Sequence, residues 1–227
     1  MKRTFFNSKG KDKQYIVIGC GRFGSSVAKK MCQLGNEVMV IDKDEDSIEN
    51  IAEQVTHTAI VDVTEERDLK SIGLGNFDVV IVAISSDIRA SIMATIMAKE
   101  MGVPKIVCKA KDELQAKVLY KIGADKVVFP ERDMGIRLAY NLASENILDQ
   151  INLDPEYSIM EIVTPTNWVG KTIIELNLRA KYDITVLAVK TPSGLKVMPS
   201  PNYKMQEKNI LIIIGNTDKI GDIILHD

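Results

Sequence analysis

The stretch that decides the fold is Tyr15-Ile16-Val17-Ile18-Gly19-Cys20-Gly21-Arg22-Phe23-Gly24, with a helical pattern from Ser25 onward. Its apolar start predicts a buried strand, and its glycines have the spacing G-x-G-x-x-G between that strand and the helix. In this context Gly19 permits a tight turn, Gly21 lets the backbone approach phosphate groups, and Gly24 lets the helix pack against the strand. The free N–H groups and the dipole of the helix then face the anion. The stretch therefore predicts a nucleotide-binding loop, and a tight turn that binds nothing is the disfavoured alternative.

The same alternation of strand and helix continues through the N-terminal part of the chain. Predicted strands cover residues 15–18, 37–41, 58–61, 79–83, 105–108 and 126–129, and predicted helices cover residues 25–34, 46–53, 65–72, 88–101 and 113–122. The strands are continuous apolar runs, which is typical of strands covered on both faces. The pattern predicts an α/β fold with a Rossmann-like, doubly wound parallel sheet.

The C-terminal part of the chain has a different character. A helix predicted over residues 132–148 ends the nucleotide-binding domain of residues 14–148, and residues 149–155 are interpreted as a linker. Beyond it, predicted strands (157–164, 184–190, 195–198 and 209–215) and helices (171–176 and 218–225) indicate a small α+β module of residues 156–227. A module of this size is marginally stable alone, so a second copy of itself would be a natural stabilising partner.

The composition is that of an ordinary globular protein. Hydrophobic residues make up 45% and charged residues 26% of the 227 residues, and the net charge of -2 gives no reason to expect a nucleic-acid surface. Residues 1–13 contain five basic residues and one acidic residue. This fits either a disordered basic arm or an arm that contacts a partner or an acidic membrane face. The longest apolar runs are far shorter than the ~20 residues that a bilayer needs, so we expect a cytoplasmic location.

Two side chains next to the loop have predicted roles. Asp42 closes the second strand 18 residues after Gly24. An acidic residue there can accept hydrogen bonds from both ribose hydroxyls, which argues against NADP. Arg22 can neutralise a phosphate directly, and this suits the terminal phosphate of ATP or ADP at least as well as a dinucleotide. The alternative for Arg22 is a surface arginine that points into water.

Further candidates lie at the carboxyl ends of the later strands, where this fold binds ligands: Asp62, Ser85, Lys109 and Glu131. Asp62 is interpreted either as an adenosine contact or as the cap of the helix that begins near Glu65. Glu131 can likewise serve only to favour the N-terminus of the helix beside it.

No catalytic constellation accompanies these residues. The chain has no G-x-S-x-G motif, and Gly170-Lys171-Thr172 does not complete a Walker loop because Pro165 stands where its first glycine belongs. An NAD-dependent oxidoreductase would need a general acid or base near the nicotinamide, and the C-terminal module offers only one histidine, His226. A protein that is not an enzyme is favoured, and the oxidoreductase is the alternative.

In this combination the sequence resembles the RCK (or KTN) gating proteins of potassium channels and transporters, particularly the regulatory subunits of bacterial Ktr potassium uptake systems. The resemblance covers nearly the whole chain. Besides the glycine loop it rests on Val40-Ile41-Asp42-Lys43, Val61-Asp62-Val63-Thr64, Phe129-Pro130-Glu131-Arg132-Asp133-Met134-Gly135, Trp168-Val169-Gly170-Lys171-Thr172, Leu176-Asn177-Leu178-Arg179, Tyr182-Asp183-Ile184 and Leu211-Ile212-Ile213-Ile214-Gly215. Val61 and Val63 depart from the Gly-Asp-Ala-Thr that is usual in the family.

The resemblance implies a cytosolic subunit that binds ATP and ADP, with NAD(H) as an alternative, and that switches a membrane potassium transporter at the inner face of the membrane. With the residues predicted above, the nucleotide-binding set is Gly19, Gly21, Arg22, Phe23, Gly24, Asp42, Lys43, Asp62, Ser85 and Lys109. Glu131 is implied to help hold Mg²⁺ or Ca²⁺ beside the phosphates. The subunits are implied to form dimers that assemble into an octameric ring.

The resemblance also implies that the C-terminal module dimerises and can bind cyclic di-AMP as a second effector. The matching residues are Arg179, Ala180, Ile184, Thr185 and Pro199. A two-fold symmetric ligand suits a two-fold interface, because each half can meet the same residues from one subunit. The alternative is that these residues only build the core and the dimer contact of the module.

Overall fold

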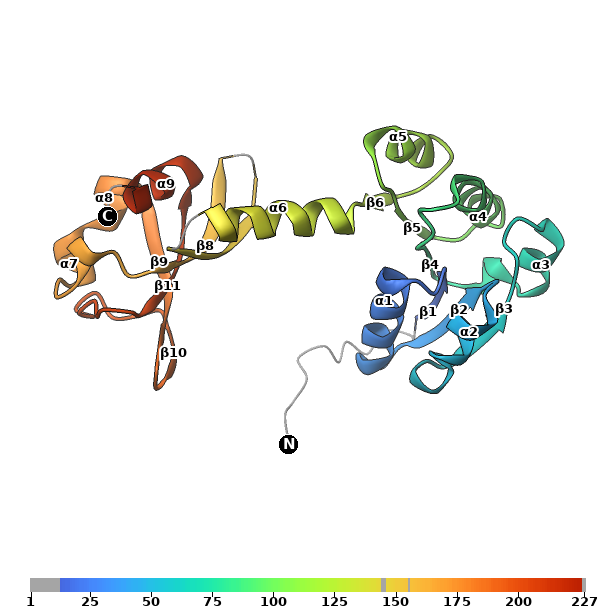
Figure 1. The fold of residues 1–227 in the computed structure, drawn as a ribbon, viewed down its shortest axis with the longest axis horizontal. Coiled ribbons are helices and arrows are strands. Elements are labelled where there is room, and N and C mark those ends of the chain that lie inside the picture. Colours follow the sequence, from blue (N-terminus) through green and yellow to red (C-terminus); the bar gives the residue numbers. More distant parts are fainter. Residues whose placement is uncertain (1–12, 144–145, 155, 226–227) are drawn as a thin grey trace. The chain divides into compact units, whose positions relative to one another are not determined.

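The computed structural model describes residues 13–143, 146–154 and 156–225, so the predicted basic arm lies almost entirely outside the described residues. The chain divides into two compact units between Arg132 and Asp133. This division lies within helix α6 (Pro130–Ala143), earlier in the chain than the predicted boundary after residue 148. Figure 1 labels most of the helices and strands of both units.

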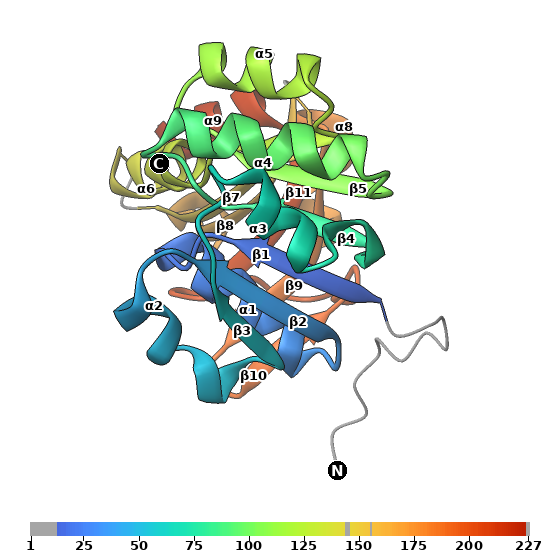
Figure 2. The ribbon, with the colours of Figure 1, turned by 90° about the vertical axis from the view of Figure 1, so that its right-hand side faces the viewer.

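The first unit is built on a sheet of six parallel strands. These strands are β1 (Gln14–Ile18), β2 (Glu37–Asp42), β3 (His57–Ile60), β4 (Val79–Val82), β5 (Lys105–Lys109) and β6 (Lys126–Val128). Their spatial order is β3-β2-β1-β4-β5-β6, and every pairing is parallel. Strands β1, β2 and β3 are seen together in Figure 2. The order confirms the predicted Rossmann-like sheet.

Helices cover both faces of this sheet. They are α1 (Arg22–Gln33), α2 (Glu45–Glu49), α3 (Glu66–Ser71), α4 (Ile88–Glu100) and α5 (Glu113–Lys121), with the short 3₁₀ helices η1 (Ala52–Gln54) and η2 (Leu74–Asn76). Alternate residues of β1 enter different cores, because side chains of a strand point to opposite faces. Val17 packs in the core that contains Ala28 of α1, whereas Ile16 and Ile18 pack in the core that contains Ala94 of α4.

The strand order reverses at β1, whose neighbours are β2 and β4. Helix α1 follows β1 onto one face of the sheet and helix α4 follows β4 onto the other. Open α/β sheets bind ligands in the crevice that such a reversal leaves at the carboxyl ends of the strands. The fold therefore brings the candidate residues at the ends of β1, β2 and β4 to one edge of the sheet.

The second unit is an antiparallel sheet covered by short helices. Its strands are β7 (Ile147–Asn152), β8 (Tyr157–Val163), β9 (Ile184–Thr191), β10 (Gly194–Val197) and β11 (Ile210–Asn216), in the order β10-β9-β11-β8-β7. Its helices are η3 (Thr166–Trp168), α7 (Ile173–Leu176), α8 (Leu178–Tyr182) and α9 (Thr217–Leu225). Buried Trp168, Met205 and Leu211 lie in its core. This arrangement confirms the predicted small α+β module.

The region around residue 147 differs from the prediction. The pattern predicts a helix to residue 148 and then a linker, but α6 ends at Ala143 and Ile147–Asn152 form β7. Strand β7 pairs antiparallel with β8, and Asp149 of β7 forms an ion pair with Arg137 of α6. Residues 147–152 therefore belong to the sheet of the second unit instead of connecting two domains.

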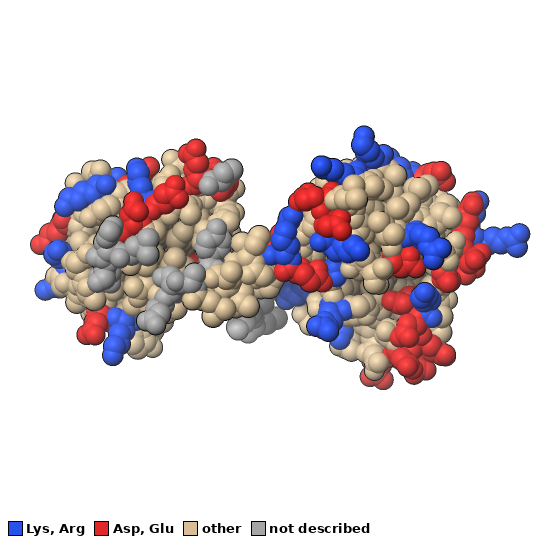
Figure 3. All heavy atoms as spheres, turned by 45° about the horizontal axis from the view of Figure 1, so that its top comes forward, with Lys and Arg blue, Asp and Glu red and all other residues tan. Residues whose placement is uncertain are grey.

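Charges of both signs are spread over the described surface. On the face drawn in Figure 3, lysine and arginine side chains are interspersed with aspartate and glutamate on both units. Within residues 13–143, 146–154 and 156–225, no helix is long and apolar enough to cross a membrane.

Candidate nucleotide-binding site

The glycine loop between β1 and α1 has the geometry that its glycines predict. Gly19 has φ +104°, a region that residues with a side chain rarely adopt, and its N–H donates to the carbonyl oxygen of Ile41 at 2.8 Å. A Cβ on Gly24 would overlap the carbonyl oxygen of Gly19, so α1 packs as closely as glycine allows. Gly21 has extended backbone (φ -69°, ψ -179°), and a Cβ there would meet no atom within 4 Å. Protein packing therefore requires glycine at residues 19 and 24, but not at residue 21.

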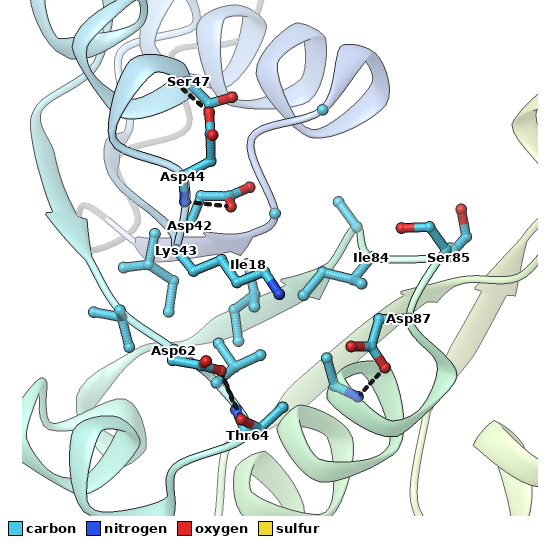
Figure 4. A pocket seen from close by; sticks show the side chains of 18 of the residues that line it. Ile18, Asp42, Lys43, Asp44, Ser47, Asp62, Thr64, Ile84, Ser85 and Asp87 are labelled. Carbon is cyan, nitrogen blue, oxygen red and sulfur yellow. Dashed lines mark hydrogen bonds between the residues drawn. The ribbon is translucent and has the colours of Figure 1, made fainter.

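A cavity of about 400 Å³ opens beside this loop. The predicted nucleotide-binding residues that line it are Gly19, Gly21, Asp42, Lys43, Asp62, Ser85 and Lys109. Figure 4 shows the side chain of Lys43 extending over the cavity from the end of β2, between Asp62 and Ile84. The remaining predicted residues, Arg22, Phe23 and Gly24, begin helix α1 and do not line the cavity.

Several cavity residues escape the sequence prediction. The polar ones are Asp44, Ser47, Thr64, Ser86 and Asp87, and the apolar ones are Ile18, Ile41, Val61, Val63, Ala83, Ile84 and Ala90. Asp44 and Asp87 are helix N-caps: Asp44 Oδ1 accepts from the N–H of Ser47 at 2.8 Å, and Asp87 Oδ1 accepts from the N–H of Arg89 at 3.0 Å. An aspartate just before a helix can be recognised as an N-cap from the sequence. Its position beside a ligand cavity cannot, because that position depends on the fold. The apolar residues provide walls that suit a flat base.

The carboxylate of Asp42 holds the glycine loop in place. Its Oδ2 accepts a hydrogen bond from the N–H of Cys20 at 2.6 Å, and its Oδ1 accepts one from the N–H of Asp44 at 3.1 Å. Each carboxylate oxygen has a second lone pair, so the group can still accept hydrogen bonds from a ribose. The geometry thus adds a structural role to the ligand-binding role that the sequence predicts.

Asp62 forms a turn with Thr64 beyond the end of β3. Its Oδ1 accepts from the N–H of Thr64 at 2.9 Å and from the hydroxyl of Thr64 at 2.7 Å. These hydrogen bonds hold the pKa of the Asp62 carboxyl below its usual value. The N-cap of α3 is Glu65, so the interpretation of Asp62 as the cap of that helix is wrong. Asp62 instead presents a charged carboxylate at the cavity.

Lys109 is a buried cation at the end of β5. Its side chain is 11% exposed, and its Nζ donates to Glu131 Oε1 at 2.6 Å. The ammonium also lies 5.9 Å from the centroid of the Phe23 ring, in the first turn of α1. Glu131 lies in the first turn of α6 and its side chain is 70% exposed. The hydrogen bond from Lys109, helped by the charge of Arg22, holds the pKa of the Glu131 carboxyl below its usual value.

Glu131 is also the residue implied to hold a divalent cation. The described residues contain no group of three or more His, Cys, Asp or Glu side chains that could hold a metal ion. In nucleotide sites, however, Mg²⁺ is usually bound by one or two carboxylates together with phosphate oxygens. A charged and exposed carboxylate such as Glu131 is a ligand of that type. The phosphate oxygens of the nucleotide would supply further ligands.

A second cavity, of about 450 Å³, lies in the second unit beside α7 and α8. Arg179, Ile184, Thr185 and Pro199 line it, whereas Ala180 is exposed and does not. The Nε of Arg179 donates to the hydroxyl of Thr185 at 3.1 Å. Its other lining residues are Ile173, Ile174, Asn177, Leu178, Val186 and Pro201. Most of the residues implied for a second effector therefore surround one mainly apolar cavity with one guanidinium.

Two family models match the chain in order. One, described as the TrkA-N domain, matches residues 15–130, and the other, described as the TrkA-C domain, matches residues 158–224. Ktr system potassium uptake protein A of Bacillus subtilis (strain 168) is 42% identical over 210 residues, which are 92% of this chain and 95% of that protein. Ktr system potassium uptake protein C of the same strain is 45% identical over 209 residues, with the same 92% and 95% coverage.

Solved structures support the fold. The crystal structure of the GsuK RCK domain matches with a TM-score of 0.54 and 24% sequence identity over 97% of this chain. The chain spans about half, 48%, of the length of that structure's chain. At this level of identity the likeness establishes the architecture.

Proposed function

Because the chain belongs to the family of TrkA-N and TrkA-C domain proteins that includes the Ktr potassium uptake proteins A and C, we propose that it is the nucleotide-sensing regulatory subunit of a membrane potassium transporter. The relatives are potassium uptake proteins and not enzymes, which removes the oxidoreductase alternative. The observation that carries the proposal is the cavity beside the glycine loop, with Asp42 and Lys109 on its wall. Such a subunit would act in the cytoplasm, at the inner face of the membrane, through its transporter partner.

ATP and ADP are the ligands that this cavity suits best. Asp42 offers acceptors to ribose hydroxyls and disfavours a 2′-phosphate, while the N-terminus of α1 and the ammonium of Lys109 offer positive charge to the phosphates. NAD(H) is the alternative, because it shares the adenosine part. The two nucleotides would switch the transporter by binding one conformation of the assembly better than another, since only differential affinity shifts an equilibrium.

Two measurements test the proposed function. Calorimetric titration with ATP, ADP and NADH should give binding of ATP and ADP. In cells that lack their own potassium uptake, growth at low potassium should require this chain together with its transporter subunit. Binding of NADH alone, or potassium uptake that is unchanged without the chain, would contradict the proposal.

Arg22 should distinguish nucleotides by their number of phosphates. It is exposed at the start of α1, and its charge helps to lower the pKa of Glu131, which is expected beside the phosphates. We expect Arg22→Ala to weaken ATP binding about tenfold, ADP binding less, and adenosine binding hardly at all. Calorimetry on the three ligands measures this. Arg67→Ala, at an exposed position of α3, is the matched control, and equal losses for all three ligands would assign Arg22 to loop support.

We propose that the chain assembles into dimers and that the dimers form an octameric ring. Helix α6 supports this, because Met134, Leu138 and Leu142 recur every fourth residue and have exposed fractions of 59%, 54% and 78%. Spacing of four residues places them on one side of the helix. An exposed apolar stripe of this kind is suited to an isologous contact with a second copy of the chain.

The cavity of the second unit is proposed as a cyclic di-AMP site. Arg179 would pair with a phosphate, while Ile184 and Pro199 would form apolar walls for the bases. In the full chain, Arg179→Ala should weaken cyclic di-AMP binding about tenfold and leave ADP binding unchanged. Lys181→Ala removes a neighbouring exposed cation that does not line this cavity, and it should alter neither affinity. Wild-type protein that binds ADP but not cyclic di-AMP would show that the second site is absent.

A further inference from the structure

Lys109, which forms an ion pair with Glu131, lines the cavity in which the proposed function puts phosphate. Lys109 lines the same cavity as Gly19 and Gly21, and its side chain is almost fully buried. A buried ammonium needs an anionic partner, since an unpaired buried charge is strongly unfavourable. The carboxylate of Glu131 is that partner, with Oε1 at 2.6 Å from Nζ.

Glu131 can give up its ion pair with Lys109 at little cost. Its side chain is 70% exposed, so it loses little when it swings into water. Its pKa is lowered by Lys109 and by Arg22, so it remains charged and repels an approaching phosphate. A phosphate group gains the N–H groups at the start of α1 in addition to Lys109. Carboxylate and phosphate are therefore competing anions for one buried cation.

We propose that Glu131 competes with nucleotide phosphate for Lys109. Nucleotide binding then breaks the ion pair that connects the first turn of α6 to Lys109. The inference rests on the proposed function and adds its regulation. A divalent cation changes the outcome, because it can lie between the carboxylate and the phosphate and bind both. Nucleotide without a cation should release Glu131 from Lys109. Nucleotide with a cation should hold Glu131 again, through the bound cation.

The position of Glu131 gives this exchange a route into the rest of the chain. The next residue, Arg132, forms an ion pair with Glu113 at the start of α5, within the first unit. Further along the same helix, Arg137 pairs with Asp149 of β7 in the second unit. Helix α6 thus carries contacts to both units, and the Lys109–Glu131 pair is the one contact of the three that involves the nucleotide cavity.

The test is an ADP titration by calorimetry, with EDTA and then with Mg²⁺. In EDTA, Glu131→Gln removes the competing charge but keeps the shape, so ADP affinity should rise on the order of fivefold. With Mg²⁺, the affinity of wild-type protein should increase while that of the variant should not. Glu113→Gln is the matched control, because it breaks the Arg132 pair in the same helical turn and leaves Lys109 untouched; its ADP affinity should equal that of wild type.

Hydrogen exchange at the amides of residues 134–136 provides a second readout. ADP in EDTA should speed exchange there in wild-type protein, and Glu131→Gln should exchange faster even without ADP. An affinity in EDTA that is unchanged or weaker in Glu131→Gln would overturn the competition while leaving the proposed function intact. Wild-type protein that does not bind ADP at all would overturn both.

Discussion

Gly24→Ala is expected to lower the free energy of unfolding by about 2–4 kcal/mol, because the added methyl group has nowhere to go. Its Cβ would overlap the carbonyl oxygen of Gly19 and lie 3.1 Å from the Cβ of Ala83. The loop cannot retreat easily, since the N–H of Gly19 is bonded to Ile41 of β2 at 2.8 Å. Denaturant unfolding of the full chain, followed by circular dichroism, measures the loss.

Gly21→Ala makes the same chemical change three residues earlier. It should leave the stability almost unchanged and strongly reduce nucleotide affinity. Its φ of -69° suits alanine, and the methyl group would meet no atom of the protein within 4 Å. The free energy of unfolding should therefore stay within about 0.5 kcal/mol of wild type. ADP and ATP affinities should fall about a hundredfold, because the methyl group lies where phosphates approach the backbone. A variant that binds both nucleotides normally would mean that the loop is only a tight turn.

The sheet of the first unit could be predicted because its signals are local. The inner strands β1 and β4 are short apolar runs with buried residues on both faces, and helices of this unit begin at readable caps such as Asp87 and Asp112. The predicted helix 46–53 is the exception, since it divides into α2 and η1 around Asn50 and Ile51. Local propensity does not decide between one continuous helix and two short ones when tertiary packing favours a break.

The second unit could be predicted less well because its elements depend on non-local partners. Strand β7 has the polar edge-strand sequence Ile147-Leu148-Asp149-Gln150-Ile151-Asn152, and only its pairing with β8 makes it a strand. Helix α8 escapes prediction because Asn177, in a left-handed conformation with φ 46°, separates it from α7. Asparagine tolerates that conformation, but the sequence alone does not require it.

The candidate site shows the same division between local and non-local signals. The glycine loop could be predicted from spacing alone, and the ends of the strands from the known binding edge of this fold. The contact of Asp42 with the N–H of Cys20 could not, because Asp42 ends β2 whereas Cys20 lies in the loop after β1, and the two meet only when β1 and β2 pair. The pairing of Lys109 with Glu131 is hidden for the same reason, since it joins β5 to α6.

Asp42→Ala should weaken ADP and ATP binding by about 1–3 kcal/mol, or roughly fivefold to 150-fold, because the ribose loses its acceptor. Affinity alone would not separate this loss from a second cause. The same carboxylate holds the N–H groups of Cys20 and Asp44, so the variant also loosens the glycine loop. A ligand that lacks one ribose hydroxyl separates the two causes.

The decisive comparison is therefore ADP against 2′-deoxy-ADP, titrated into wild-type protein and into Asp42→Ala. If the carboxylate accepts from the ribose, wild-type protein should prefer ADP and the variant should bind both ligands equally, because residue and hydroxyl then form one coupled pair. If Asp42 only supports the loop, both ligands should weaken by the same factor and the preference should survive in the variant. Asp44→Ala is the matched control: Asp44 lines the same cavity and caps α2 through Ser47, so its loss should leave the preference for ADP intact.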